Sequence, residues 1–258
     1  MDTLQFAATK IQPPRLRSTR IARPRLDGAL AAALGRRRVM LLAAPAGFGK
    51  TSLLAAQIAQ LPPGTALAWV SLDEDEDAPR LFACLTAALE PHDLPWRSAP
   101  AALAAQIGAD EAGAKRAVTE LLNALAGAEV AHGVIVLDDL HRVQSPQVHT
   151  LLDALIERLP PQWLLVLATR VEPPLALARW RVADELAELP QDELRFRSDE
   201  AQALLAAEAD GAALGGRAAE LLERTQGWPA GLRLCLAALR TRKSCSSAGM
   251  SSSTSLAR

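Results

Sequence analysis

Five short apolar runs alternate with Leu- and Ala-rich stretches of helical periodicity between residues 27 and 195. Continuous apolar runs of this length are typical of strands buried on both faces of a parallel sheet. The predicted strands cover residues 38–43, 66–72, 133–138, 163–168 and, with the weakest signal, 185–189. The predicted helices cover residues 26–34, 51–60, 81–89, 101–126 and 146–159. This alternation predicts an α/β fold with a five-stranded parallel sheet flanked by helices on both faces.

The pattern changes near both ends of the chain. Residues 1–26 are rich in Pro and Arg and predict an extended basic lead-in before the α/β domain of residues 27–195. Only helices are expected in residues 196–243, which predict a small all-helical unit. Residues 244–258 contain seven serines and little to bury, so they predict a disordered tail. The helical unit looks unfinished, and a truncation or a shift of reading frame would account for its ending.

The segment between the first strand and the next helix is suited to phosphate. Residues 44–51 match the pattern G-x-x-x-x-G-K-[ST] at every fixed place except the first, where Ala44 replaces glycine. Small residues let backbone N–H groups approach phosphate oxygens, Lys50 supplies a charge, and the Thr51 hydroxyl suits Mg²⁺. A chance match in an ordinary strand–helix turn is the alternative, and the flanking strand and helix argue against it. The residues expected to bind nucleotide here are Pro45, Ala46, Gly47, Phe48, Gly49, Lys50, Thr51 and Ser52.

A second motif supplies the acids that phosphate chemistry needs. The apolar residues 134–137 run directly into Asp138 and Asp139, at the carboxyl end of a predicted strand, where open α/β sheets bind ligands. We expect Asp138 to hold Mg²⁺ together with Thr51, and Asp139 to polarise the attacking water. Two solvated acids that merely end a strand are the alternative.

Arg170 follows the fourth predicted strand and is expected at the same edge of the sheet. Its planar guanidinium suits bidentate contact with phosphate, so it is a candidate sensor of the γ-phosphate. The candidate catalytic residues are therefore Lys50, Asp139 and Arg170, with a surface arginine in a loop as the alternative for the last.

Charge, cysteine content and hydropathy limit the cellular compartment in which we expect the protein. The net charge is −1, although nine basic residues and one acid lie between Lys10 and Arg38. The three cysteines fit neither a disulfide framework nor a zinc pattern, and Cys84 and Cys235 are expected to be reduced core thiols. No stretch has the length and purity of a membrane span, and no signal-peptide core is present. We therefore expect a cytoplasmic protein without a membrane partner.

Two other groups of polar residues have structural interpretations. The acidic run at residues 73–77 lacks the spacing and glycine of a calcium loop, and most of it is expected to be a solvated helix start. His141 lies three residues after Asp138 and either orients the second acid or forms a structural hydrogen bond.

Seven short phrases occur in a fixed order along the chain. They are Thr9-Lys10-Ile11 with Pro13-Pro14, residues 44–51, Trp69-Val70-Ser71-Leu72-Asp73, residues 136–141, Ala168-Thr169-Arg170, Leu194-Arg195-Phe196, and residues 225–232. In this order they resemble the N-terminal ATPase region of MalT-like, LuxR-family large ATP-binding transcriptional regulators, a branch of the STAND class of signalling P-loop NTPases. The resemblance covers residues 9–240, and the alanine that opens the phosphate loop is usual in that family.

The resemblance implies a nucleotide switch. It implies that ADP holds a closed resting form, that ATP and inducer favour an open, self-associating form, and that slow hydrolysis resets the switch. Lys50, Thr51, Asp138, Asp139 and Arg170 match the family's phosphate, magnesium, Walker B and sensor residues. By the same likeness Pro229 packs against the base, and Arg20, Ile21 and Arg23 help to enclose adenine. The choice of ATP over GTP rests on the resemblance.

Full members of that family continue with further helical domains, an inducer-binding repeat domain and a helix-turn-helix. None of these is expected within 258 residues, so we expect no DNA-binding domain in this chain. The basic lead-in lacks interleaved aromatic residues and is expected to be solvated or to face nucleotide rather than nucleic acid. Two other functions stay open: a self-contained ATPase or phosphotransferase, and a remnant that binds nucleotide without an output.

Overall fold

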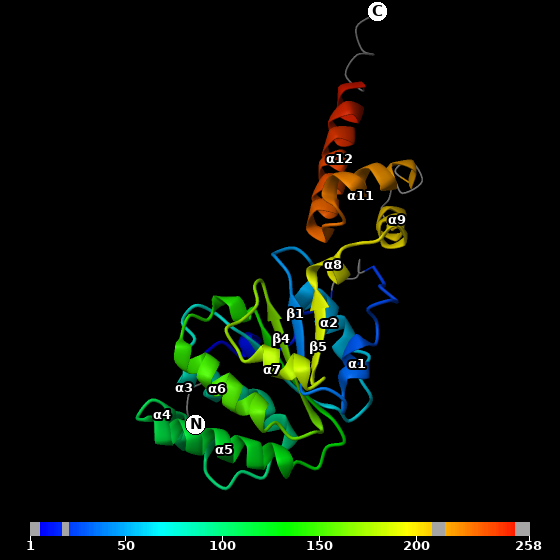
Figure 1. The fold of residues 1–258 in the computed structure, drawn as a ribbon. Coiled ribbons are helices and arrows are strands. Elements are labelled where there is room, and N and C mark those ends of the chain that lie inside the picture. The colour runs from blue at the N-terminus through cyan, green and yellow to red at the C-terminus, as the bar shows by residue number, and fades with distance from the viewer. Residues whose placement is uncertain (1–5, 17–20, 208–214, 251–258) are drawn as a thin grey trace, which may run out of the picture. The chain divides into compact units, whose positions relative to one another are not determined.

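The computed structural model describes residues 6–16, 21–207 and 215–250, and only the backbone of residues 240–250. The described residues form a five-stranded sheet with the order β2-β3-β4-β1-β5, in which every neighbouring pair is parallel. The predicted five-stranded parallel sheet is therefore confirmed (Figure 1). The strands are β1 Val39–Ala43, β2 Ala66–Ser71, β3 Gly133–Asp138, β4 Trp163–Thr169 and β5 Leu186–Pro190.

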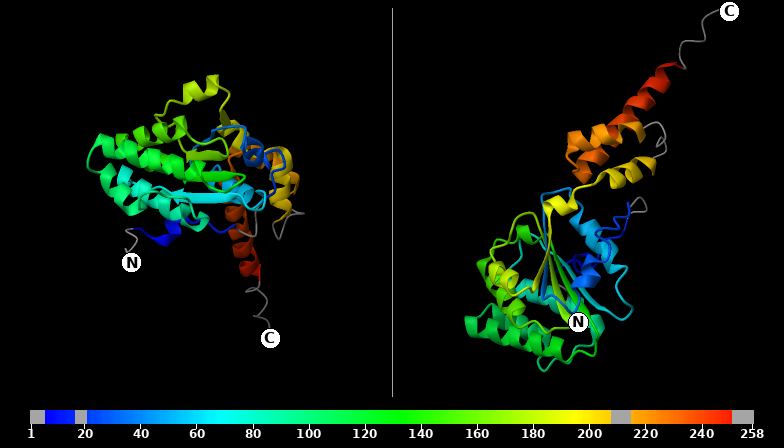
Figure 2. Two further views of the ribbon diagram at one scale, coloured as in Figure 1. Left: turned by 90° about the horizontal axis from the view of Figure 1, so that it is seen from below. Right: turned by 45° about the vertical axis from the view of Figure 1, so that its right-hand side comes forward.

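Burial explains the continuous apolar runs. Every residue of β3 and β4 is buried, because these strands have neighbours on both sides and helices on both faces. The helices of this region are α1 Ala29–Ala33, α2 Lys50–Ile58, α3 Ala78–Leu89, α4 Pro100–Ile107, α5 Glu111–Ala126, α6 Pro146–Glu157 and α7 Leu177–Val182. Helices α3–α6 cover one face of the sheet, and α1 and α2 cover the other (Figures 1 and 2).

Alternate strand residues pack against the α3–α6 layer. Val39, Leu41, Ile135 and Leu137 belong to one buried apolar cluster with the inner faces of these four helices. Side chains of a strand point alternately to the two faces of its sheet, so their neighbours in sequence point to the opposite layer. Short 3-10 helices, η1 Ala8–Ile11, η2 Glu90–His92 and η3 Leu140–Arg142, connect the larger elements.

Two features of this region differ from the sequence pattern. The Ala-rich stretch at 101–126 is divided into α4 and α5, because the Asp110 side chain accepts the backbone N–H of Gly113 at 2.5 Å and starts a new helix. Helix α7 has no counterpart among the predicted helices. It is a short element held by the buried side chains of Leu177 and Trp180, and its six residues are too few to display a helical period.

The chain divides into two units. Unit 1 comprises Met1–Leu16, Pro24–Pro45 and Lys50–Gln191, and unit 2 comprises Arg17–Arg23, Ala46–Gly49 and Asp192–Arg258. The division between Gln191 and Asp192 lies close to the predicted boundary at 195/196. The lead-in, predicted as one segment, is shared between the two units. The phosphate loop is shared as well, with residues 46–49 counted in unit 2.

Unit 2 is helical and has its own core. Ile21, Phe196, Leu204, Leu221 and Leu232 are buried members of one apolar cluster. Its helices are α9 Ser198–Ala206, α11 Ala218–Thr225 and α12 Pro229–Met250, with η4 Gly215–Arg217 between them and the short α8 Gln191–Leu194 before them. Helix α12 continues beyond residue 244, where we expected disorder to begin, and residues 251–258 lie outside the described part of the chain.

Candidate nucleotide-binding site

The phosphate loop leaves β1 at the carboxyl edge of the sheet. The backbone N–H of Ala44 donates to the carbonyl of Thr169 at 3.2 Å, so the loop begins beside the end of β4. Gly47 and Gly49 have φ angles of +80° and +78°, in the left-handed region that side chains other than glycine rarely adopt. Both glycines of the loop are therefore required by the backbone, although only Gly49 is a fixed position of the pattern, and the loop leads into α2 at Lys50.

The Lys50 side chain turns back, so that its ammonium group contacts the phosphate loop. Nζ donates to the carbonyl oxygens of Ala44 at 2.6 Å and Pro45 at 3.2 Å, and the side chain is buried. Burial lowers the pKa of Lys50 from its ordinary 10.5, Arg170 adds to this shift, and the carboxylates of Asp139 and Asp138 oppose it. The charges that act on Lys50 show that these three groups lie around it.

Thr51 and Asp138 are close enough for the hydroxyl to act on the carboxyl. The Asp138 carboxyl accepts the backbone N–H of Asp139 at 3.0 Å. Burial raises the pKa of Asp138, and the charge of Asp139 raises it further, while the Thr51 hydroxyl and the charge of Lys50 oppose the shift. A hydroxyl and a carboxylate, both oxygen ligands that suit a metal ion, thus lie near each other at the end of β3 and the start of α2.

Asp139 and Arg170 complete the cluster. Asp139 has a φ of +60°, and its Oδ1 lies 3.8 Å from Nδ1 of His141. Burial lowers the pKa of His141, and the nearby charge of Arg170 lowers it further. Arg170 itself is exposed, directly after β4. Lys50, Thr51, Asp138, Asp139 and Arg170 therefore lie together at the carboxyl ends of β1, β3 and β4.

The AAA ATPase domain family matches residues 21–167, which is more than half of the chain. The chain belongs to this family. The assignment implies nucleotide binding, and it confirms the P-loop NTPase fold expected from the sequence.

The chain is also similar, at moderate identity, to parts of longer proteins. It is 34% identical over 241 residues to the serine/threonine-protein kinase PknK of Mycobacterium tuberculosis, covering 90% of this chain and 21% of the relative. It is 30% identical over 245 residues to the HTH-type transcriptional regulator MalT of Yersinia enterocolitica, covering 92% of this chain and 25% of the relative. The chain therefore spans about a fifth to a quarter of these relatives. The resemblance to the MalT-like ATPase region is confirmed.

A solved structure supports the fold. The Walker-type ATPase PABY2304 of Pyrococcus abyssi superimposes with a TM-score of 0.51 at 16% identity, covering 86% of this chain and 68% of the other. At this identity the likeness concerns the fold alone.

Among the lead-in residues that were expected near adenine, Arg20 lies outside the described residues. Ile21 is buried in the core of unit 2. Arg23 is buried, and its guanidinium donates to Glu200 at 3.1 Å and to the carbonyls of Leu194 and Arg195 at 2.9 and 2.8 Å. These contacts give Ile21 and Arg23 a structural role in unit 2.

Pro229 is buried as the first residue of α12, a position that proline favours. Its predicted contact with the base stays a prediction. Its neighbour Trp228 belongs to the phrase at residues 225–232 but was not among the predicted site residues. It contacts the phosphate loop, because the indole N–H donates to the carbonyl of Ala46 at 3.0 Å. Ala230 also donates its backbone N–H to the carbonyl of Gly47 at 3.1 Å. The signal in the sequence that could have found it is its place beside Pro229 in the phrase at residues 225–232.

The acidic run is only partly solvated. Glu74, Asp75 and Asp77 are exposed, and Asp77 caps α3 by accepting the backbone N–H of Arg80 at 2.8 Å, as a helix start should. The carboxylate of Glu76, in contrast, is buried. The expectation was that most of the run is solvated, and Glu76 is the exception, because a cation from the lead-in reaches it.

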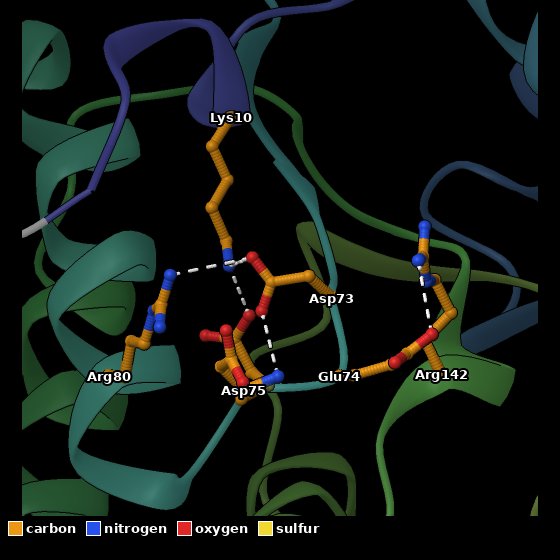
Figure 3. Close-up of polar contacts among 7 residues, drawn as sticks. Lys10, Asp73, Glu74, Asp75, Arg80 and Arg142 are labelled. Atoms are coloured by element: carbon orange, nitrogen blue, oxygen red, sulfur yellow. Dashed lines mark hydrogen bonds and ion pairs between the residues drawn. The ribbon is translucent and has the colours of Figure 1, made fainter.

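That cation is Lys10, which extends from η1 toward the acidic run (Figure 3). Its Nζ lies 2.5 Å from Oε2 of Glu76 and 2.7 Å from Oδ2 of Asp73, and Arg80 adds a contact of 3.4 Å to Asp73. Glu74 pairs with Arg142 on the exposed side of the same segment. A lysine in the Thr9-Lys10-Ile11 phrase therefore secures the lead-in to unit 1.

The residues at the loop fit magnesium. Mg²⁺ prefers oxygen ligands and in nucleotide sites takes one or two from the protein and the rest from phosphates and water. The Thr51 hydroxyl and Asp138 carboxylate offer such a pair, and no group of three or more metal-ligating side chains was found among the described residues. No helix within the described residues is long and apolar enough to cross a membrane.

The lowered pKa of Lys50 predicts the pH dependence of ATP binding. The Lys50 amine attracts phosphate only in its charged form. The affinity for ATP should therefore decrease once the pH rises above the pKa of Lys50 in the nucleotide-free protein, which lies below 10.5. Binding then requires proton uptake, and affinity is lost by up to about tenfold per pH unit. Calorimetric titration with ATP between neutral and alkaline pH measures this slope. The slope should disappear in Lys50→Ala, and an identical slope in that variant would contradict the assignment.

Proposed function

We propose that this AAA ATPase domain is an ATP-binding regulatory module that acts as a nucleotide-dependent switch in a MalT-like, LuxR-family transcriptional regulator. The observation that carries the proposal is the meeting of Lys50, Thr51, Asp138, Asp139 and Arg170 at one edge of the sheet. In this proposal the module binds ATP in preference to GTP, hydrolyses it slowly, and self-associates in its ATP form.

Each side chain has a role that suits its surroundings. Lys50 exchanges its loop carbonyls for phosphate oxygens, and Arg170 contacts the γ-phosphate. Thr51 and Asp138 would hold Mg²⁺, which neutralises phosphate charge when it is bound. Asp139, beside them and partly exposed, orients and deprotonates the attacking water.

The hydrogen bonds of the phosphate loop support a coupling between bound nucleotide and the helical unit. Its carbonyls at residues 46 and 47 accept hydrogen bonds from Trp228 and Ala230 at the start of α12. A change in loop conformation with bound nucleotide therefore alters contacts at the start of that helix, which is the differential contact that a switch needs. The similarity to a transcriptional regulator supports a role of the switch in transcription.

The proposed location is the cytoplasm. Burial raises the pKa of the free Cys84 thiol to about 12, and such an unreactive core thiol suits the cytoplasm.

One set of measurements tests the proposal. Purified protein is titrated with ATP, ADP and GTP with and without Mg²⁺, and its size is measured by analytical ultracentrifugation in each state. We expect ATP and ADP to bind, turnover to be slow, and ATP to favour a larger species. Absence of nucleotide binding would refute the proposal. Rapid turnover, or phosphate transfer to a small acceptor, would indicate the self-contained enzyme instead.

Asp138→Asn separates metal binding from phosphate binding. The amide keeps the shape of the side chain but loses its charge, so Mg²⁺-dependent ATP affinity should decrease by at least about tenfold, a loss seen even for outer partners of metals. Binding measured in EDTA should change little. Asp75→Asn, in an exposed carboxylate of the neighbouring segment, is the matched control. Equal Mg²⁺ dependence in both variants would exclude Asp138 as a ligand.

A further inference from the structure

Two donors at the start of α12 bind adjacent carbonyls of the phosphate loop. The indole N–H of Trp228 donates to Ala46 at 3.0 Å, and the backbone N–H of Ala230 donates to Gly47 at 3.1 Å. All four residues belong to unit 2. The approach is close, because a Cβ on Gly47 would lie 2.6 Å from Cβ of Ala230 and 2.7 Å from Nε1 of Trp228.

The indole is held in place by its surroundings. The backbone before it is fixed by the Phe196 N–H, which donates to the carbonyl of Gly227 at 2.7 Å. The ring packs directly on Gly231, where an added Cβ would lie 2.6 Å from a ring carbon. The donor of Trp228 is therefore aimed at the loop by the fixed backbone before it and by the packing of its ring on Gly231, although the side chain is 37% exposed.

Peptide geometry makes these contacts relevant to phosphate. A trans peptide is planar, and its C=O and N–H point in opposite directions. When the Ala46 carbonyl points to the indole, the N–H of Gly47 points away from it. The same holds for the Gly47 carbonyl and the N–H of Phe48. The two bonds thus set the direction of two loop N–H groups, which are the groups that a phosphate loop presents to its anion.

We infer that Trp228 is a positioning residue of the phosphate loop, acting with the Ala230 N–H to orient the loop amides toward the phosphates of a nucleoside di- or triphosphate. The inference rests on the proposed nucleotide binding and adds a residue to it. Since Trp228 acts on the loop and not on the γ-phosphate or the water, ATP and ADP are affected equally, and the chemical step is unaffected.

Trp228→Phe tests this inference, because it keeps an aromatic ring and removes the donor. We expect the Kd for both ATP and ADP to rise about 3- to 10-fold, as for loss of one hydrogen bond, with KM raised and kcat within about twofold of the parent. Trp180→Phe is the matched control, since the Trp180 indole N–H has no hydrogen-bond partner among the described residues. Unchanged affinity in Trp228→Phe, equal to that of Trp180→Phe, would overturn the inference.

Gly231→Ala provides a second test from the opposite side of the ring. The added methyl group displaces the indole, while alanine in place of glycine favours the helix. We expect weaker nucleotide binding with helicity retained in circular dichroism. A variant that melts earlier but binds nucleotide normally when folded would show a merely structural role and overturn the inference. If the parent protein binds no nucleotide, the proposed function fails, whereas normal binding in both variants refutes only the role of Trp228.

Discussion

Lys50→Ala is expected to weaken ATP binding by about 10- to 100-fold and to abolish hydrolysis. The loss corresponds to about 1.5–3 kcal/mol for hydrogen bonds from a charged donor. Nζ already donates to two loop carbonyls, and the charges of Asp138, Asp139 and Arg170 act on it, so the alanine removes the cation from this cluster. Isothermal titration with ATP measures the change.

Stability should respond little to the same substitution. Burial lowers the pKa of Lys50, which shows that the folded protein disfavours its charge in the absence of phosphate. Lys115→Ala is the matched control, because that lysine lies on α5 in an exposed pair with Glu111. Full ATP affinity in Lys50→Ala would contradict the phosphate-binding assignment of the loop, whatever the similarity to other ATPases.

Lys10→Met is expected to lower the free energy of unfolding by about 3–5 kcal/mol, the usual result of removing one partner from a buried ion pair. Methionine replaces the apolar stem but not the ammonium, and the carboxylate of Glu76, which is 3% exposed, loses its cation. Asp73 retains Arg80 and is less affected. Urea unfolding at neutral pH measures the loss, and Lys115→Met provides the control with an exposed lysine.

Acidification should reduce this loss. Burial raises the pKa of Glu76 even in the parent, where Lys10 opposes the shift, so the pKa should rise further in the variant. An acid with a raised folded pKa binds protons more tightly when folded, and stability therefore increases as the pH falls through that pKa. The difference in the free energy of unfolding between Lys10→Met and the parent protein should therefore become smaller at acidic pH.

A double variant tests whether the uncompensated charge of Glu76 causes this loss of stability. Lys10→Met combined with Glu76→Gln should recover much of the stability, because no uncompensated charge stays buried. A deficit in Lys10→Met that does not depend on pH, or a double variant less stable than the single one, would contradict this account.

The strands and the edge of the sheet that carries the candidate site were predictable from local patterns. An apolar run such as residues 134–137 can only be a fully buried strand when helices cover both faces, and two acids at its end must lie at the carboxyl edge of the sheet. Thr51 directly after the loop was placed beside Asp138 by the same reasoning, because β1 and β3 are parallel members of one sheet. Short elements such as α7 were not predicted, because six residues are too few to show the apolar periodicity of a helix.

By itself, the sequence determined the α/β sheet, the phosphate loop and the acids opposite it, because these depend on runs of apolar residues and on glycine conformations within a few positions. Only the tertiary structure decided that Lys10 neutralises Glu76, 66 residues away, and that Trp228 holds the carbonyl of Ala46, 182 residues away. The physical reason is that a hydrogen-bonding side chain specifies the chemistry of its partner, whereas the fold of the backbone chooses which partner comes within reach.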